Sequence, residues 1–204
     1  MSDSPAPAPR ERARVQRVPA RGRYEREVID AILDEGLVAH VAFDPEHGPA
    51  VIPTAFWRDG DRLLFHSSAA SRALRALRPG ASCSVCVTLL DSIVLARSGF
   101  HHSMNYRSVV VYGEPVELTG EAEKTAALRD FTEKIAPGRW EELRPPTAQE
   151  MKATAVFALS LDEASAKVRE GGPVDEEGRL RARRLGRCRP ALAGAWRIGA
   201  VTRG

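Results

Sequence analysis

The pattern of apolar and polar residues changes period several times along the chain, and each change marks a new element. Apolar residues recur at the 3.6-residue period of an amphipathic helix over residues 24–35 and again over residues 121–135. Glycine or proline follows each stretch, as is usual where a helix ends. Shorter helical segments are predicted at residues 72–78 and 147–152, so the helices are few and mostly short.

Elsewhere the apolar residues alternate with polar ones or form short β-branched runs bounded by turn residues, which is typical of β-strands. The predicted strands are residues 37–43, 50–57, 62–66, 81–90, 92–97, 105–118 and 153–161. A tight turn at Asp91 is expected between the fourth strand and the fifth. The connections resemble hairpins and not βαβ units, so the sequence predicts a mainly β fold: a six- to seven-stranded antiparallel barrel with flanking helices.

The formal net charge of +3 is unevenly distributed. Residues 24–177 hold 16 basic and 25 acidic side chains, whereas residues 178–204 hold eight arginines and no acid. An acidic body argues against nucleic acid as the main ligand. Residues 1–22 are rich in Pro, Ala and Arg and are expected to be a disordered tail. Without an apolar run that would span a membrane or act as a secretion signal, we expect no membrane partner and a cytoplasmic protein.

The cysteine and histidine spacings do not favour a metal centre. Cys83 and Cys86 have a CxxC spacing, but they fall on a predicted strand, where residues three apart face opposite sides. We therefore interpret them as structural thiols in a reducing compartment. His101 and His102 are adjacent but have no third ligand at a helpful spacing, so no metal site is predicted.

Three segments carry candidate chemistry, and the first is the turn at residues 66–72. Here a strand ends at His66, the hydroxyls of Ser67 and Ser71 gather before a helix, and Arg72 stands in its first turn. Small donors and an arginine at a helix start are the parts of a phosphate site. The alternative is an ordinary helix cap followed by a solvated arginine.

The other two segments are less specific. Tyr106 and Arg107, at the start of an apolar strand, suit an anionic, planar ligand, although an interface ion-pair cluster is the alternative. Pro53, within the strand 50–57, has no N–H to donate to a neighbouring strand, so this strand lies at an edge or lines a cavity.

Together, these segments resemble the flavin-binding split-barrel family related to pyridoxamine 5′-phosphate oxidase, in its flavin-nucleotide-binding or nitroimidazole-resistance-like branch. The resemblance rests on RGRYEREVIDAILDEG, VIPT, HSSAASR, LARSGFHHSMNYRSVVVYG, PGRWEELRPPT and LDEASAKVREGGP. It implies an FMN-binding split-barrel domain over residues 23–170, in a homodimer that holds two FMN molecules at its interface. The cofactor-binding residues it implies are Val51, Ile52, Pro53, Thr54, His66, Ser67, Ser71, Arg72, Tyr106, Arg107 and Ser108. Ala73 stands where the oxidases have a lysine, and Arg75 is positioned to compensate.

The leading expectation is an FMN-dependent oxidoreductase that transfers hydride to or from a small-molecule substrate. NAD(P)H or a flavin reductase would be the electron donor, and His102 or Tyr106 is the candidate general acid. The alternatives are a non-catalytic flavin carrier or sensor, a binder of the deazaflavin F420, and a haem protein with His101 or His102 as ligand.

The C-terminal segment, residues 171–204, is Arg-rich and expected to be disordered. After about Glu177 its composition resembles a GC-rich gene translated out of frame, so we interpret this part as a frameshift product. The alternative is a native basic tail that binds nucleic acid or membrane.

Overall fold

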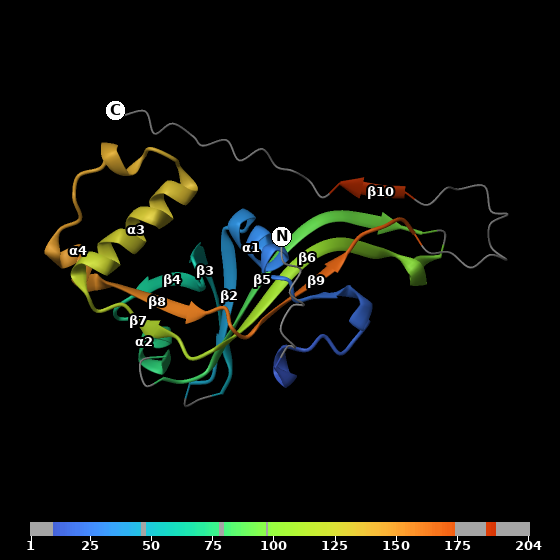
Figure 1. Ribbon diagram of the computed structural model, residues 1–204, viewed down its shortest axis with the longest axis horizontal. Coiled ribbons are helices and arrows are strands. Elements are labelled where there is room, and N and C mark those ends of the chain that lie inside the picture. The colour runs from blue at the N-terminus through green and yellow to red at the C-terminus, as the bar shows by residue number, and fades with distance from the viewer. Residues whose placement is uncertain (1–9, 46–47, 78–79, 97, 174–186, 191–204) are drawn as a thin grey trace, which may run out of the picture. The chain divides into compact units, whose positions relative to one another are not determined.

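The computed structural model describes residues 10–45, 48–77, 80–96, 98–173 and 187–190 (Figure 1). Within them the chain forms a ten-stranded sheet with the order β1-β9-β6-β5-β2-β3-β4-β8-β7, and β10 pairs with β5. The strands are β1 (Gly22–Arg23), β2 (Val38–Phe43), β3 (Ala50–Asp59), β4 (Arg62–Ser68), β5 (Cys83–Leu95), β6 (Ser103–Gly113), β7 (Val116–Glu117), β8 (Thr154–Ser160), β9 (Ala164–Arg169) and β10 (Arg187–Pro190). The α-helices are α1 (Arg26–Glu35), α2 (Arg72–Leu77), α3 (Glu121–Ile135) and α4 (Ala148–Ala153).

This architecture confirms the predicted mainly β, antiparallel fold with flanking helices. Each strand pair with a described register is antiparallel. Contacts divide the chain into two compact units, residues 1–89 with 107–168 and residues 90–106 with 169–204. No helix among the described residues is long and apolar enough to cross a membrane.

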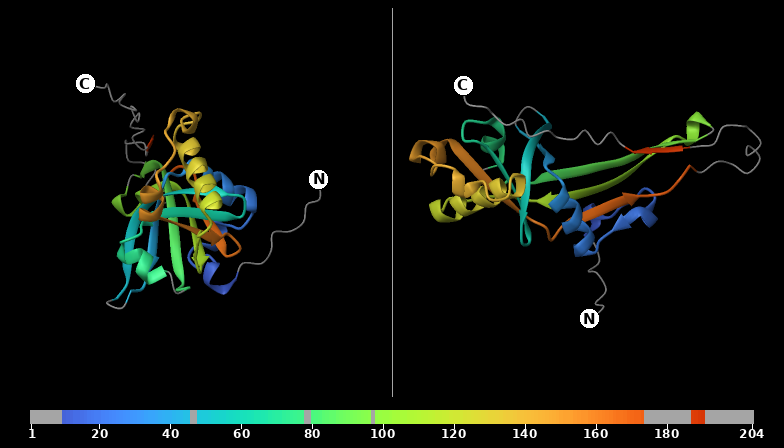
Figure 2. Two further views of the ribbon diagram at one scale, coloured as in Figure 1. Left: turned by 90° about the vertical axis from the view of Figure 1, so that its left-hand side faces the viewer. Right: turned by 90° about the horizontal axis from the view of Figure 1, so that it is seen from above.

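The first unit has two hydrophobic clusters, one on each side of the strands β3, β4 and β8. The larger cluster includes Val41 of β2, Phe56 of β3 and Phe157 of β8, which are essentially fully buried, and α1 packs against it through Ile32. The smaller cluster lies under α3 (Figure 2); it contains Trp57, Leu64, Val156 and Ala127. Alternation along the strands therefore supplies both faces of the sheet with apolar side chains.

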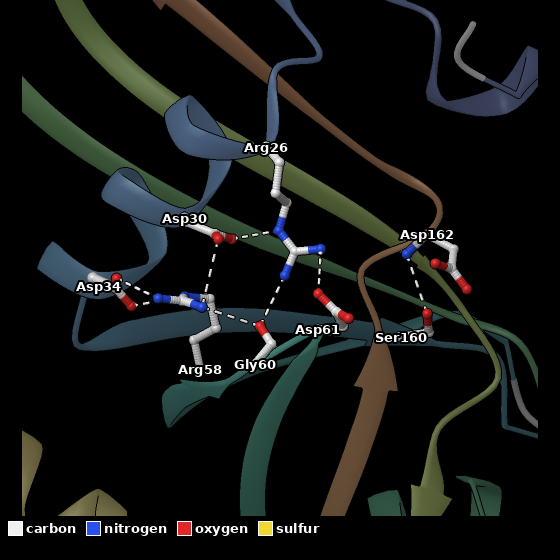
Figure 3. Close-up of polar contacts among 8 residues, drawn as sticks. All are labelled: Arg26, Asp30, Asp34, Arg58, Gly60, Asp61, Ser160 and Asp162. Carbon is white, nitrogen blue, oxygen red and sulfur yellow. Dashed lines mark hydrogen bonds and ion pairs between the residues drawn. The ribbon is translucent and has the colours of Figure 1, made fainter. Parts of the chain in front are cut away.

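Ion pairs fasten α1 to the β3–β4 hairpin (Figure 3). Arg58 Nε and Nη2 donate to the two carboxylate oxygens of Asp34 at 2.9 and 2.6 Å. Arg26 donates to Asp30 at 2.6 Å and pairs with Asp61 in the hairpin turn at 3.0 Å. Ion pairs as exposed as these contribute about 1 kcal/mol or less each, so they orient the helix while its buried face supplies the stability.

Several predicted boundaries differ from the structure. β5 is one strand of 13 residues and has no turn at Asp91, because no glycine or proline there forces the chain to reverse. The strand predicted over 105–118 is divided between β6 and β7, and Pro115, which lacks an N–H, lies in the gap. The strand β9 was not predicted; it pairs with β1, so its place in the sheet depends on a distant partner.

The N-terminal segment is structured from Arg10 onwards, so the prediction of a disordered tail is wrong for residues 10–22. They form two short 3₁₀ helices, η1 (Glu11–Ala13) and η2 (Pro19–Arg21). Arg12 donates from Nε and Nη2 to Glu163 at 2.7 and 2.6 Å, and Ala13 is buried. The remainder of the predicted N-terminal tail lies outside the described residues, as does most of residues 171–204 with the postulated frameshift. Within that C-terminal segment Arg187–Pro190 form β10, which pairs with β5, so the expected disorder does not hold for these four residues.

In the second unit, polar contacts gather around Asn105. Its Nδ2 donates to Ser92 Oγ at 3.0 Å and to the Gly171 carbonyl at 3.1 Å. Arg169, which is buried, donates from Nη1 to Asn105 Oδ1. Beyond the 3₁₀ helix η3 (Gly99–His101), the Nδ1 atom of His102 accepts from the Ala96 N–H at 3.0 Å.

Candidate functional site

The structure brings two of the three predicted segments together, because β3 and β4 are adjacent antiparallel strands. Thr54 Oγ1 donates to the backbone carbonyl of His66 at 3.0 Å. In the turn that follows, Ser67 Oγ and Ser71 Oγ lie 2.8 Å apart and share a hydrogen bond, and Ser71 N–H donates to the Ser68 carbonyl at 2.9 Å. The predicted cluster of hydroxyls is therefore a pre-formed turn held against β3.

Two arginines, Arg72 and Arg75, lie in the short helix that follows this turn. Arg75 is exposed, and its Nη1 approaches the Ala70 carbonyl at 3.4 Å, so its guanidinium lies beside the turn. The side chain of Arg72 lies outside the described part of the structure, and its predicted role stays a prediction. α2 begins at Arg72 and is only six residues long, so the donors here are mainly the hydroxyls and Arg75.

The side chain of His66 lies on the face of β4 opposite to that of Ser67, against Phe131 of α3. Its ring centroid is 5.1 Å from that of Phe131 and 6.2 Å from that of Trp57. Burial lowers the pKa of His66, so its imidazole is neutral near pH 7. Its Nδ1 atom and Trp57 Nε1 are buried without a hydrogen-bond partner among the described residues. His66 therefore contributes to the turn through its carbonyl and not as a cation.

Residues 51–54 alternate between the two faces of β3. Thr54 bonds to β4 and Ile52 packs against the larger cluster, whereas Val51 and Pro53 are exposed on the outer face. Pro53 pairs with His40 on β2, whereas the described pairing of β3 with β4 covers only Phe56–Asp59, so the strand is unpaired at Pro53 on the side away from β2, as a residue without an N–H requires.

The outer face of β2, β3 and β5 carries a histidine that the sequence analysis did not select. His40 lies directly opposite Pro53 on β3 and Cys86 on β5, and cross-strand partners project to the same side of a sheet. Its neighbours Val38 and Val51 are 53% and 61% exposed. We call this surface the His40 face; its members are Val38, His40, Ala42, Val51, Pro53, Ser84 and Cys86. The signal in the sequence was a lone polar residue at an exposed position of the strand VAHVAF.

The third predicted segment makes contacts of its own within the chain. Arg107 donates from Nη1 and Nη2 to the carboxylate of Glu35 at 2.6 and 2.9 Å. Ser108, on the opposite face of β6, donates to the Lys167 carbonyl at 3.3 Å. The ion pair fixes β6 against the C-terminal end of α1, and the predicted alternative of an ion-pair cluster at an interface stays a prediction. The predicted cofactor roles of Tyr106, Arg107 and Ser108 stay predictions.

The two adjacent histidines of the second unit differ from each other. His101 packs edge-on against the exposed ring of Phe100, at 5.5 Å between centroids. His102 accepts at Nδ1, so in the neutral ring the proton is on Nε2. A histidine that binds iron through Nε2 instead donates from Nδ1, so this arrangement disfavours His102 as a ligand. The described residues contain no group of three or more His, Cys, Asp or Glu arranged to hold a metal ion.

The chain was compared with known proteins. The family described as Pyridoxamine 5'-phosphate oxidase matches residues 25–168. The solved structure of the flavocytochrome Anf3 from Azotobacter vinelandii is 41% identical, with 90% of this chain and 86% of that chain covered and a TM-score of 0.85. The FAD and haem binding protein from Mycobacterium smegmatis is 36% identical, with 84% of each chain covered and a TM-score of 0.79.

A more distant structure shares the fold alone. A structure from Bacteroides thetaiotaomicron, provisionally described as a 5-nitroimidazole antibiotic resistance protein, is 18% identical to this chain. The match covers 72% of this chain and 86% of that chain, with a TM-score of 0.61. No functionally curated protein matches the chain.

Proposed function

From the premise that this chain belongs to the pyridoxamine 5'-phosphate oxidase family, we propose that it is a redox protein that binds both a flavin and a haem. The observation that carries the proposal is its 41% and 36% identity, over most of each chain, to a flavocytochrome and to an FAD and haem binding protein. These similarities favour FAD over the FMN expected from the sequence. They also move haem from an alternative to part of the main proposal.

The residues of the β3–β4 region fit the flavin. Thr54 holds the carbonyl of His66, and the paired hydroxyls of Ser67 and Ser71 lie where β4 runs into α2. Hydroxyls and an exposed guanidinium such as that of Arg75 are suited to bind a phosphate group.

The His40 face fits a haem. A porphyrin is planar and largely apolar, and its iron takes an axial histidine. His40 is exposed between Val38, Val51 and Pro53, and its side chain has no hydrogen-bond partner among the described residues. We therefore propose that His40 would bind the haem iron, in place of the His101 or His102 suggested by the sequence.

The bound groups would supply hydride transfer at the flavin and one-electron transfer at the haem. The protein's own contribution is to bind and orient them. The turn at Ser67 fixes the phosphate end, and the apolar His40 face excludes water from the haem edge. His102, with its proton on Nε2, is an exposed donor that would protonate a substrate.

The test is the visible spectrum of the purified protein, with mass analysis of the flavin released by heat. We expect a flavin spectrum, released FAD, and a Soret band. His40→Ala should lose the Soret band and keep the flavin, whereas His101→Ala and His102→Ala should keep both. A protein that binds neither added flavin nor haem would refute the proposal, and a Soret band unchanged in His40→Ala would refute the ligand.

Two further parts of the proposal are separable. We propose a homodimer, because the exposed apolar side chains of Leu90, Ile93, Phe100 and Met104 in the second unit would be covered by a second copy; light scattering of the eluting protein should give twice the chain mass. We also propose that the flavin is reduced by NAD(P)H or by a flavin reductase and passes its electrons to a small molecule. Steady-state turnover with a donor and an acceptor distinguishes this enzyme from a non-catalytic carrier.

A further inference from the structure

A cavity of about 210 Å³ lies between the N-terminal segment and the sheet. Residues 12–17 form one wall, and Ser108, Tyr112, Ser165 and Lys167 of β6 and β9 form the other. Drug-sized ligands occupy pockets of roughly 300 to 1,000 Å³, so this cavity suits one end of a ligand.

The charged groups that line the cavity are all basic: Arg12, Arg14, Arg17 and Lys167. Arg12 is neutralised by its bidentate contact with Glu163. Arg14, Arg17 and Lys167 form no ion pair among the described residues. Three cations around a concave site attract an anion more strongly than the same charges dispersed over a convex surface.

A neighbouring cavity provides an internal contrast. It has a volume of about 280 Å³ and shares Arg12 and Tyr112 with the first, but its lining includes Glu114, Asp162 and Glu163. The basic character is therefore specific to the cavity under residues 12–17 and is not a general property of this surface.

The N-terminal segment is held in place independently of any ligand. The Val15 N–H donates to Tyr24 Oη at 3.0 Å, and Ala13 is 3% exposed. The Arg12 guanidinium lies 5.4 Å from the centroid of the Tyr112 ring. The backbone that carries Arg14 is thus fixed beside the hydroxyls of Ser108 and Ser165, and a pre-organised site loses less entropy on binding.

We propose that this cavity binds the diphosphate group of a nucleotide through Arg14, Arg17 and Lys167. A guanidinium matches two phosphate oxygens at once, and an ammonium adds a point charge. The turn at Ser67 on β4 is the site proposed above for the flavin's own phosphate, and β5, β2 and β3 lie between β4 and the two strands of this cavity in the sheet. The diphosphate bound here is therefore that of a second, free nucleotide, and not that of the flavin.

The first experiment titrates the full-length protein with inorganic pyrophosphate by calorimetry, at low and at high salt. Arg14→Gln/Arg17→Gln should weaken binding at least about 10-fold, because two charge-assisted hydrogen-bonding groups are lost. The control Arg129→Gln/Lys152→Gln removes the same charge from exposed positions on α3 and α4 and should bind as the wild type does. Lys167→Gln tests the sheet wall separately. A wild type that does not bind pyrophosphate, or an arginine double variant that binds equally well, would overturn the proposal.

The second experiment identifies the source of the diphosphate with protein from which flavin has been removed. If the cavity held the diphosphate of FAD, the arginine double variant would bind both FAD and FMN at least about 10-fold more weakly, because the phosphate of FMN is one of the two, and this result would overturn the assignment to a free nucleotide. If both flavins bind as in the wild type while pyrophosphate does not, the ligand is a free nucleotide. A protein that binds no flavin refutes the proposed function, and the pyrophosphate titration still decides the cavity.

Discussion

A half-buried lysine makes the stability of this protein depend on pH in a direction that is unusual for lysine. Lys134, in the last turn of α3, donates to the Leu33 carbonyl at 2.8 Å, and its Nζ lies 4.5 Å from the centroid of the Phe56 ring. Burial lowers the pKa of Lys134 from 10.5 to about 8; nearby Arg58 lowers it further and Asp34 opposes the shift.

The sign follows from proton linkage. Between the folded pKa of about 8 and the unfolded value of 10.5, the unfolded chain binds more protons than the folded one, so the free energy of unfolding rises with pH. Below pH 8 both states are protonated, and the folded state bears the cost of the buried charge. From pH 7 to pH 9 the difference in bound protons, integrated over the two pH units, is close to one, which corresponds to about 1.3 kcal/mol; because Lys134 is only half-buried, solvent screening reduces the expected gain to roughly 0.5 to 1 kcal/mol.

The assay is urea unfolding of the wild type and Lys134→Met at pH 7 and pH 9. The difference in unfolding free energy, wild type minus variant, should rise by roughly 0.5 to 1 kcal/mol. Taking the difference removes the opposite effect of Cys83, whose pKa is raised by burial to about 11 and which lowers stability above pH 9. Lys152→Met, which removes an exposed ammonium, should follow the wild type at both pH values. Parallel changes in the wild type and Lys134→Met would refute the argument.

Two further predictions concern the core of the first unit. Gly36→Ala should lower the free energy of unfolding by about 1 to 3 kcal/mol, because a Cβ there would lie 2.9 Å from the Phe56 ring; an unchanged urea midpoint would contradict this. In a Cys188→Ser background at pH 8, Cys86 should react with a disulfide reagent much faster than Cys83, which is 5% exposed and has its pKa raised to about 11. Equal reaction rates would show that the β5 face around Cys83 opens readily.

The local pattern was sufficient to locate most of the elements. The helix predicted over 121–135 has those bounds in α3, and the prediction of 24–35 differs from α1 by two residues at its start. In α1 the buried residues Ile29, Ile32 and Leu33 recur within the segment itself, and in α3 Leu128 and Phe131 pack beside the buried Ala127, so no distant contact is needed to recognise either helix. The turn at residues 66–71 was likewise visible, because its hydroxyls are close together in sequence.

The sequence by itself thus determined the mainly β class, the helices and the family to which the chain belongs. The tertiary structure decided which groups meet. Arg12 and Glu163 are 151 residues apart, and Arg107 and Glu35 are 72 apart, so neither ion pair has a local signal. The His40 face and the basic cavity also combine residues from separate strands. Such sites depend on strand order and register, which arise only when the whole sheet assembles.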